Sequence, residues 1–153
     1  MIDFLLAATL QDVPLREAVE AEMSSLLEHY RWFHQNPELS SKEEKTAARF
    51  AAEVREAGWT VTEKVGGTGV VAALRNGPGP AVFARIDMDG LPIKEETGLP
   101  YASVNGAMHA CGHDVHLSAG IGFARALAKT KAHWSGTVFL IGQPAEELSL
   151  IHI

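Results

Sequence analysis

The segment at residues 81–86, AVFARI, does most to constrain the fold, because it is almost wholly apolar and ends abruptly at Asp87. A short apolar run bounded by turn residues predicts a strand that is covered on both faces of a sheet. A second run of this kind, residues 137–141, leads into Gln143 and Pro144. Strands of this kind are typical of α/β proteins, in which helices pack on a central sheet.

Three other segments carry the three- and four-residue spacing of amphipathic helices. The first is predicted over residues 15–35, where His34 is expected at the surface or in packing. The second is predicted to begin at a capping-box signal at Ser40 and Ser41 and to end near residue 57. The third runs from Asp114, its expected N-cap, to about residue 129.

Two β-rich segments, residues 59–65 and 69–74, complete the pattern, and the glycine-rich residues between them predict a tight turn. We therefore expect an α/β fold in which helices pack on a central mixed β-sheet. In open α/β sheets, sites form in the crevice beyond the carboxyl ends of the strands. The polar residues that follow the predicted strands fall at this edge.

Composition and charge limit the class of protein. The 153 residues, 46% hydrophobic and 21% charged, suit one soluble globular domain. The net charge is −6 and the basic residues are scattered singly, so no nucleic-acid partner is expected. The apolar residues 4–10 are too few to cross a bilayer, so no membrane partner is expected. The single cysteine excludes an internal disulfide and, without a secretory signal, predicts a cytoplasmic protein.

The nine residues 108–116, MHACGHDVH, hold three histidines and the single cysteine. If residues 109–113 are extended, alternate side chains share a side, so His109, Cys111 and His113 are expected to point the same way. Thiolate and imidazole are ligands of zinc and similar ions. A structural zinc module needs four such ligands in paired motifs, which one cysteine disfavours. The alternative is a set of ordinary core residues.

Paired acidic residues follow both buried strands. After the second strand, Glu146 and Glu147 diverge, so one carboxylate could hold a metal ion while the other takes a proton from water. The alternative is a solvated acidic loop. After the first strand, Asp87 and Asp89 are candidate ligands, groups that orient a ligand histidine, or turn formers. His116, one helical turn beyond His113, lines the site or serves in capping or packing.

Several stretches together resemble the amidohydrolase branch of the dinuclear metallopeptidases, which includes hippurate hydrolases and indoleacetyl-amino-acid hydrolases. The resemblance extends over residues 20–147 and is carried, in unchanged order, by residues 31–40, 67–69, 87–93, 108–116 and 143–147. It implies a zinc-peptidase-like catalytic domain that cleaves the amide bond of N-acyl amino acids into a carboxylic acid and a free amino acid.

The resemblance also assigns roles to single residues. Cys111, His113 and Glu147 would be metal ligands in a centre of two divalent ions, zinc, manganese or cobalt. Glu146 would be the general base and, with Asp89, a candidate catalytic residue. Relatives elsewhere in the superfamily have a ligand histidine where this chain has Asp87, so the role of Asp87 stays open. Two alternatives are an amidase that uses Cys111 as nucleophile with His109 or His113 as base, and a metal-binding fragment without turnover.

Two expectations concern the extent of the chain. Residues 1–147 are expected to be the amino-terminal part of the catalytic domain, without the lid domain and two further histidine ligands, and therefore poorly active or inactive alone. The parent protein is expected to be a homo-oligomer. Residues 148–153 match an in-frame translation of a transposon-end adapter used in DNA library preparation, so we expect them to be a non-native tail.

Overall fold

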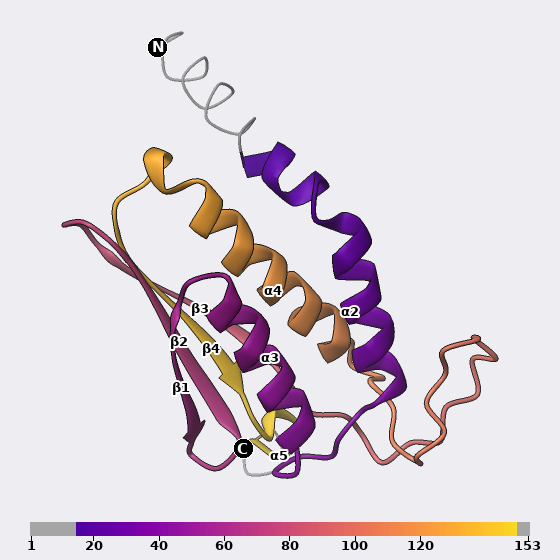
Figure 1. Ribbon diagram of the computed structural model, residues 1–153. Coiled ribbons are helices and arrows are strands. Elements are labelled where there is room, and N and C mark those ends of the chain that lie inside the picture. Colours follow the sequence, from indigo (N-terminus) through magenta and orange to yellow (C-terminus); the bar gives the residue numbers. More distant parts are fainter. Residues whose placement is uncertain (1–14, 150–153) are drawn as a thin grey trace, which may run out of the picture.

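The computed structural model describes residues 15–149, which form helices on a four-stranded sheet (Figure 1). Residues 150–153 of the expected tail at 148–153 lie outside the described part, as do the apolar residues 4–10. Residues 15–20 are helical, and the elements that follow are α2 (Met23–Gln35), α3 (Glu44–Glu56), β1 (Thr60–Val65), β2 (Gly69–Asn76), β3 (Ala81–Asp87), α4 (His113–Lys129), the 3-10 turn η1 (Lys131–His133), β4 (Gly136–Gln143) and the single-turn α5 (Glu146–Ser149).

The sheet has the strand order β1-β2-β4-β3 and is mixed. β2 is antiparallel to β1 and β4, whereas β3 runs parallel to β4, with Ala84 opposite Leu140. Helix α3 packs on β1 and β2, α4 packs on β3 and β4, and α2 packs on α4. The predicted α/β fold, with helices on a central mixed sheet, is confirmed.

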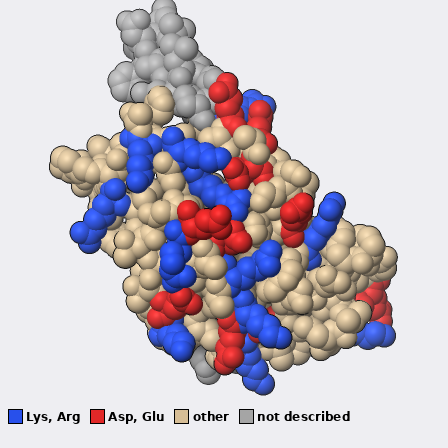
Figure 2. All heavy atoms as spheres, in the orientation of Figure 1, with Lys and Arg blue, Asp and Glu red and all other residues tan. Residues whose placement is uncertain are grey.

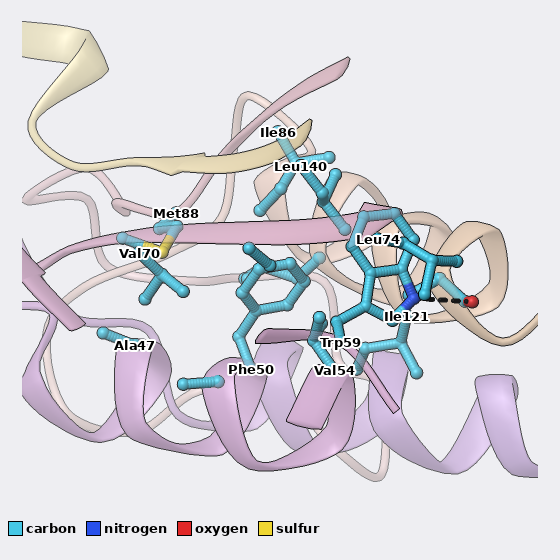
Figure 3. Packing of buried hydrophobic residues seen from close by; sticks show 14 of the residues in the cluster. Ala47, Phe50, Val54, Trp59, Val70, Leu74, Ile86, Met88, Ile121 and Leu140 are labelled. Atoms are coloured by element: carbon cyan, nitrogen blue, oxygen red, sulfur yellow. Dashed lines mark hydrogen bonds between the residues drawn. The ribbon is translucent and has the colours of Figure 1, made fainter. Parts of the chain in front are cut away.

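The core lies between this sheet and helices α3 and α4 (Figure 3). Phe50 and Val54 of α3, Ile121 of α4 and Leu140 of β4 are fully buried there. These positions follow the helical spacing and the strand alternation, which place one face of each element against its neighbour. The indole nitrogen of Trp59 donates a hydrogen bond of 3.0 Å to the carbonyl oxygen of Ala124, another residue of α4.

The prediction that both faces of β3 are covered is wrong. β3 is an edge strand, and Val82 and Phe83 are 52% and 66% exposed. Phe83 stacks on Phe139 at a centroid distance of 4.9 Å, on the sheet face opposite the helices. An apolar run predicts a strand, but neighbouring elements decide whether both faces are covered. No helix within residues 15–149 packs on this face.

The continuity of the first helix and the caps at the starts of α3 and α4 also differ from the predictions. The first helix is interrupted by a turn at residues 21–22. Ser40 does not cap α3, because the carboxylate of Glu38 accepts hydrogen bonds from the backbone N–H groups of Lys45 and Thr46, at 3.2 and 2.8 Å. At α4 the N-cap is a glycine, not Asp114, which lies in the first turn. A carboxylate from outside the helix can satisfy the free N–H groups as well as a local cap does.

Two general features bear on partners. Among the described residues no helix is both long and apolar enough to span a membrane. On the face seen in Figure 2, basic side chains are interspersed with acidic ones. Arg125, for example, pairs at 2.7 Å with both Glu22 and Glu53.

Candidate metal centre

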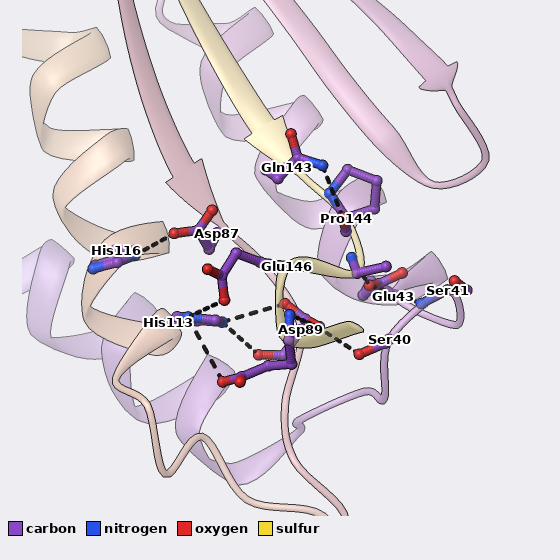
Figure 4. A network of polar contacts seen from close by, with 12 residues as sticks. Ser40, Ser41, Glu43, Asp87, Asp89, His113, His116, Gln143, Pro144 and Glu146 are labelled. Carbon is purple, nitrogen blue, oxygen red and sulfur yellow. Dashed lines mark hydrogen bonds and ion pairs between the residues drawn. The ribbon is translucent and has the colours of Figure 1, made fainter. Parts of the chain in front are cut away.

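The ends of β3 and β4 and the start of α4 meet at one edge of the sheet (Figure 4). Asp87 is paired with Gln143 in the last register position of the two parallel strands, and the N–H of Met88 donates to the carbonyl oxygen of Gln143 at 3.2 Å. This pairing brings the segment at Asp89 beside the segment at Glu147. The carboxyl ends of parallel strands therefore gather the acidic residues, as the sequence predicts.

The residues before α4 form a turn, so residues 109–113 do not meet the condition, an extended backbone, under which His109, Cys111 and His113 would point the same way. The N–H of Gly112 donates to the carbonyl oxygen of His109 at 3.1 Å, and Gly112 has a φ of 81°, which glycine adopts readily. The turn separates His109 from its two expected companions. His109 is 4% exposed, and neither ring nitrogen has a hydrogen-bond partner. It belongs to neither of the donor groups described below.

Cys111, His113 and Glu147 form the first donor group, with one ligand atom of each within 4.8 Å of the others. Nδ1 of His113 donates to the carbonyl oxygen of Asp89 at 2.9 Å, which leaves Nε2 to face the acidic pair. Nε2 lies 3.8 Å from Oε2 of Glu146 and 4.0 Å from Oε1 of Glu147. A metal-bound histidine typically has this arrangement, with its other nitrogen held by a carbonyl group.

Two electrostatic features show that the first donor group fits a cation. Oε1 of Glu147 is buried without a hydrogen-bond partner, which is costly for a carboxylate unless a positive charge lies close by. The Glu147 carboxylate beside the thiol raises the pKa of Cys111, and burial and the charges of Glu146 and Asp87 act in the same direction. A cation among these groups would reverse the effect, because a coordinating thiol is deprotonated. Thiolate, imidazole and carboxylate together suit zinc and similar borderline ions.

Asp89 connects the two segments that carry this group. Its Oδ2 accepts hydrogen bonds from Oγ of Ser40 at 2.6 Å and from the N–H of Glu147 at 3.1 Å, and its Oδ1 lies 3.3 Å from Nδ1 of His113. Burial raises the pKa of Asp89, but the hydrogen bonds from His113, Ser40 and Glu147 outweigh it and lower the pKa to about 2. This geometry matches the expected orienting role. Its candidate catalytic role stays a prediction.

Glu43 is a supporting residue that the sequence analysis did not identify. It is fully buried, and its Oε1 accepts hydrogen bonds from the N–H groups of Ser41 at 2.9 Å and Ala145 at 2.8 Å, while Oε2 accepts from Oγ1 of Thr68 at 2.5 Å. Ala145 has a φ of 52°, which is unfavourable for a residue with a side chain. Glu43 therefore holds the turn that presents Glu146. No local pattern reveals this, because Ala145 is 102 residues away.

A second donor group lies beside the first and shares His113 with it. One atom each of Asp87, His113 and His116 lie within 4.8 Å of one another. Nδ1 of His116 is 3.4 Å from Oδ2 of Asp87, and the ring of His116 stacks on that of His113 at 5.3 Å. Asp87 also pairs with Nε of Arg85 at 3.1 Å. The structure thus places His116 at the site, whereas the sequence left open whether it lines the site or serves in capping or packing.

Comparisons with known proteins agree with this geometry. Residues 83–150 match the sequence model of "Peptidase family M20/M25/M40". The chain is 48% identical over 120 residues to thermostable carboxypeptidase 2 of Saccharolobus solfataricus, covering 76% of this chain and 30% of the relative. It is 40% identical over 135 residues to the N-acetylcysteine deacetylase of Bacillus subtilis, covering 86% of this chain and 36% of the relative.

A solved structure gives the same result. The Bacillus subtilis YXEP protein, described as a dinuclear metal binding peptidase from the M20 family, superposes with a TM-score of 0.79 and 40% identity, covering 85% of this chain and 37% of that one. The chain spans about a third of the length of the curated relatives that it matches. Sequence and architecture agree that the chain is similar to members of peptidase family M20/M25/M40, whose model matches residues 83–150.

Proposed function

We propose that the protein is a metal-dependent amidohydrolase that cleaves the amide bond of N-acyl amino acids. Cys111, His113 and Glu147 bind metal in a centre of two divalent ions, zinc, manganese or cobalt. The observation that carries this proposal is the convergence of these three side chains within 4.8 Å, from segments 34 residues apart in the chain. Metal-site donors that are brought together by tertiary structure and held by buried partners rarely serve packing alone.

The side chains around the centre have separate roles in this proposal. Divalent ions supply Lewis-acid chemistry, because they make a water molecule more acidic and polarise an amide carbonyl group. Glu146, whose carboxylate lies beside His113, accepts the proton that the attacking water loses and returns it to the leaving nitrogen. Asp89 and Glu43 hold the segments that carry the ligands and the base. The products are a carboxylic acid and a free amino acid.

The relatives support the choice of substrate class. A carboxypeptidase and an N-acetylcysteine deacetylase, by their names, both hydrolyse an amide bond next to an amino-acid unit. An N-acyl amino acid is the smallest molecule with that bond. We extend this substrate class to the present protein as part of the proposal.

The thiol-amidase alternative is less well supported. Its nucleophile, Cys111, has a raised pKa in the acidic surroundings of Glu147, whereas a nucleophilic cysteine needs a lowered one. One of its two expected bases, His109, belongs to no donor group with the thiol. The second alternative, a metal-binding protein without turnover, differs from the proposed hydrolase only in activity, so the experiment below distinguishes the two.

The test separates metal binding from hydrolysis. Zinc and cobalt titrations of the 153-residue chain should show that Cys111→Ser and Glu147→Gln weaken binding, whereas Glu146→Gln does not. In the protein expressed from its complete gene, a chelator should abolish release of amino acid from N-acetyl amino acids, and Zn²⁺ or Mn²⁺ should restore it. Glu146→Gln should bind metal but not turn over. Hydrolysis that resists chelation and stops on thiol alkylation would favour the thiol route instead.

A further inference from the structure

His34, near the end of α2, lies between two buried carboxylates. Its Nδ1 is 2.7 Å from Oδ2 of Asp114 and its Nε2 is 3.0 Å from Oε1 of Glu95. The three side chains are 7%, 3% and 0% exposed, so little solvent reaches the contacts. Glu95 lies 61 residues and Asp114 lies 80 residues after His34 in the chain.

The two contacts indicate the protonation state of the ring. An ionised carboxylate only accepts hydrogen bonds, so both ring nitrogens of His34 must donate, which requires an imidazolium. Burial lowers the pKa of His34, but the hydrogen bonds and charges of Asp114 and Glu95 outweigh it and raise the pKa above its usual value. Charge-assisted bonds of this kind are stronger than neutral ones.

One end of this contact reaches the candidate metal centre. Asp114 directly follows His113 in the first turn of α4. Its Oδ1 accepts a hydrogen bond from the N–H of Val115 at 2.8 Å, and its carbonyl oxygen accepts one from Oγ of Ser118 at 2.8 Å. The Asp114 carboxylate is thus held at Oδ1 by Val115 and at Oδ2 by His34, and the bond to His34 ties the first turn of α4 to α2.

The other end holds a long connection between β3 and α4. Besides His34, Glu95 accepts hydrogen bonds from the N–H of Ser103 at 2.5 Å and from the hydroxyl of Thr97. The ring of Tyr101 packs edge-on against His34 at 5.3 Å. Residues 95–103 therefore fold around Glu95, and His34 joins Glu95 to α2. Tyr101 also contacts the α2 residues Tyr30 and Arg31.

We propose that His34 is a positioning residue of the metal centre, an imidazolium that fastens residues 95–103 to the first turn of α4 and so fixes the orientation of His113. The inference rests on the proposed function, because it assumes that His113 binds metal. His34 touches no ligand and acts through Asp114.

Two variants and one control test the positioning role. His34→Gln removes the cation, and Glu95→Gln keeps the shape but removes the charge at the far end. Val54→Ala is the control, since Val54 is a fully buried core residue of α3 outside both donor groups. Cobalt titrations are read by the cobalt–thiolate absorption of Cys111, at a temperature below the unfolding midpoint of every variant. The first two variants should bind cobalt about tenfold more weakly, which is the lower end of the affinity loss seen when residues that hold a ligand are replaced. Val54→Ala should bind like the wild type.

A metal-free measurement tests the fastening of the loop itself. Lys94 is 84% exposed at its side chain and precedes Glu95, so trypsin cleavage after Lys94 reports on release of the loop. We expect His34→Gln to be cut there several times faster than the wild type, and Val54→Ala to be cut at the wild-type rate. Tethered loops resist cleavage because a protease needs several residues of locally unfolded chain.

The outcomes separate the two proposals. If His34→Gln and Glu95→Gln both bind cobalt like the wild type, or if cleavage after Lys94 is unchanged in His34→Gln, the positioning role is wrong and the metal centre stands. If the wild type shows no cobalt–thiolate absorption, the proposed metal centre fails and the role of His34 in positioning fails with it, even where the loop is found to be fastened.

Discussion

The carboxylate and the carbonyl group of Asp89 both hold His113, at 3.3 and 2.9 Å from Nδ1. The same carboxylate accepts the N–H of Glu147 at 3.1 Å. One residue after β3 thus orients a ligand from the start of α4 and a ligand from the turn after β4. Residues behind a ligand set its orientation and basicity, so the relationship has consequences for metal affinity.

We expect Asp89→Asn to weaken zinc or cobalt binding by about 10- to 100-fold. If the amide oxygen takes the place of Oδ2 and keeps the bonds from Ser40 and Glu147, the NH2 group faces the N–H of Nδ1 of His113, and two donors then oppose each other. The substitution also removes the negative charge beside His113. Isothermal titration of the 153-residue chain measures the change. Ser40→Ala is the control, since it removes one donor and leaves the carboxylate, and should have a smaller effect. Wild-type affinity in Asp89→Asn would contradict the orienting role.

Asp89 should also contribute to stability in a pH-dependent way. Its pKa of about 2 lies below the usual aspartate value of 3.8, so the folded state favours the ionised form. The contribution, about 2 kcal/mol, is present above about pH 4 and is lost as the pH falls through about 2. Chemical denaturation at a series of pH values should show the free-energy gap between wild type and Asp89→Asn narrowing with acidity. A gap that stays constant would contradict the prediction.

The stabilising contribution of His34 should depend on pH in the opposite direction. Its pKa is raised, so its stabilising contribution is fully present below about pH 6.5 and is lost as the pH rises through the folded-state pKa. We expect the free energy of unfolding of the wild type to fall from about pH 6 toward about pH 9 by more than that of His34→Gln. The free energies of unfolding can be measured by urea denaturation at each pH. If they change with pH equally in the wild type and His34→Gln, the ring is not charged between Asp114 and Glu95.

Gly136 and Gly66 form a matched pair for backbone predictions. Both have positive φ, 118° and 63°, but a Cβ on Gly136 would lie 2.4 Å from the carbonyl oxygen of Pro80, whereas one on Gly66 meets nothing within 4 Å. We expect Gly136→Ala to destabilise by about 3 kcal/mol or more and Gly66→Ala by about 1 kcal/mol. Thermal unfolding of both variants measures the difference, and equal losses would mean that the close approach at Gly136 relaxes freely.

The elements that position the site were predictable because their patterns are local. Residues 66–68 form the expected turn between β1 and β2, and α3 ends within one residue of the expected position. Asp87 and Glu147 were expected to lie close together because both follow strands of one sheet, and a parallel pairing brings such ends to one edge. This topology brings together the segments that carry Cys111, His113 and Glu147, whereas the choice of these three residues as ligands came from the family resemblance.

What the sequence could not predict depends on partners far away in the chain. Glu43 and His34 sit in capping or amphipathic patterns that describe their own segments, whereas one hydrogen bond of each reaches a residue 80 or more positions away. Phe83 belongs to an apolar run whose second face no local pattern describes. The turn at Gly112 was missed because extended and turned backbones share the same residue types. Apart from this local turn, each miss is a tertiary arrangement that overrides a local expectation.

The open sheet face leads to the last prediction. Phe83 is 66% exposed and stacks on Phe139, and exposed apolar patches of a sheet favour association between molecules. Phe83→Thr keeps the preference for a strand, removes the aromatic surface and should cost about 1 kcal/mol in stability through the lost ring contact. Sedimentation velocity over a range of concentrations should show less self-association than in the wild type. Val104→Thr is the control, since Val104 is 95% exposed in the connection between β3 and α4 and should leave association unchanged. If both variants associate like the wild type, the face around Phe83 does not mediate contacts between molecules.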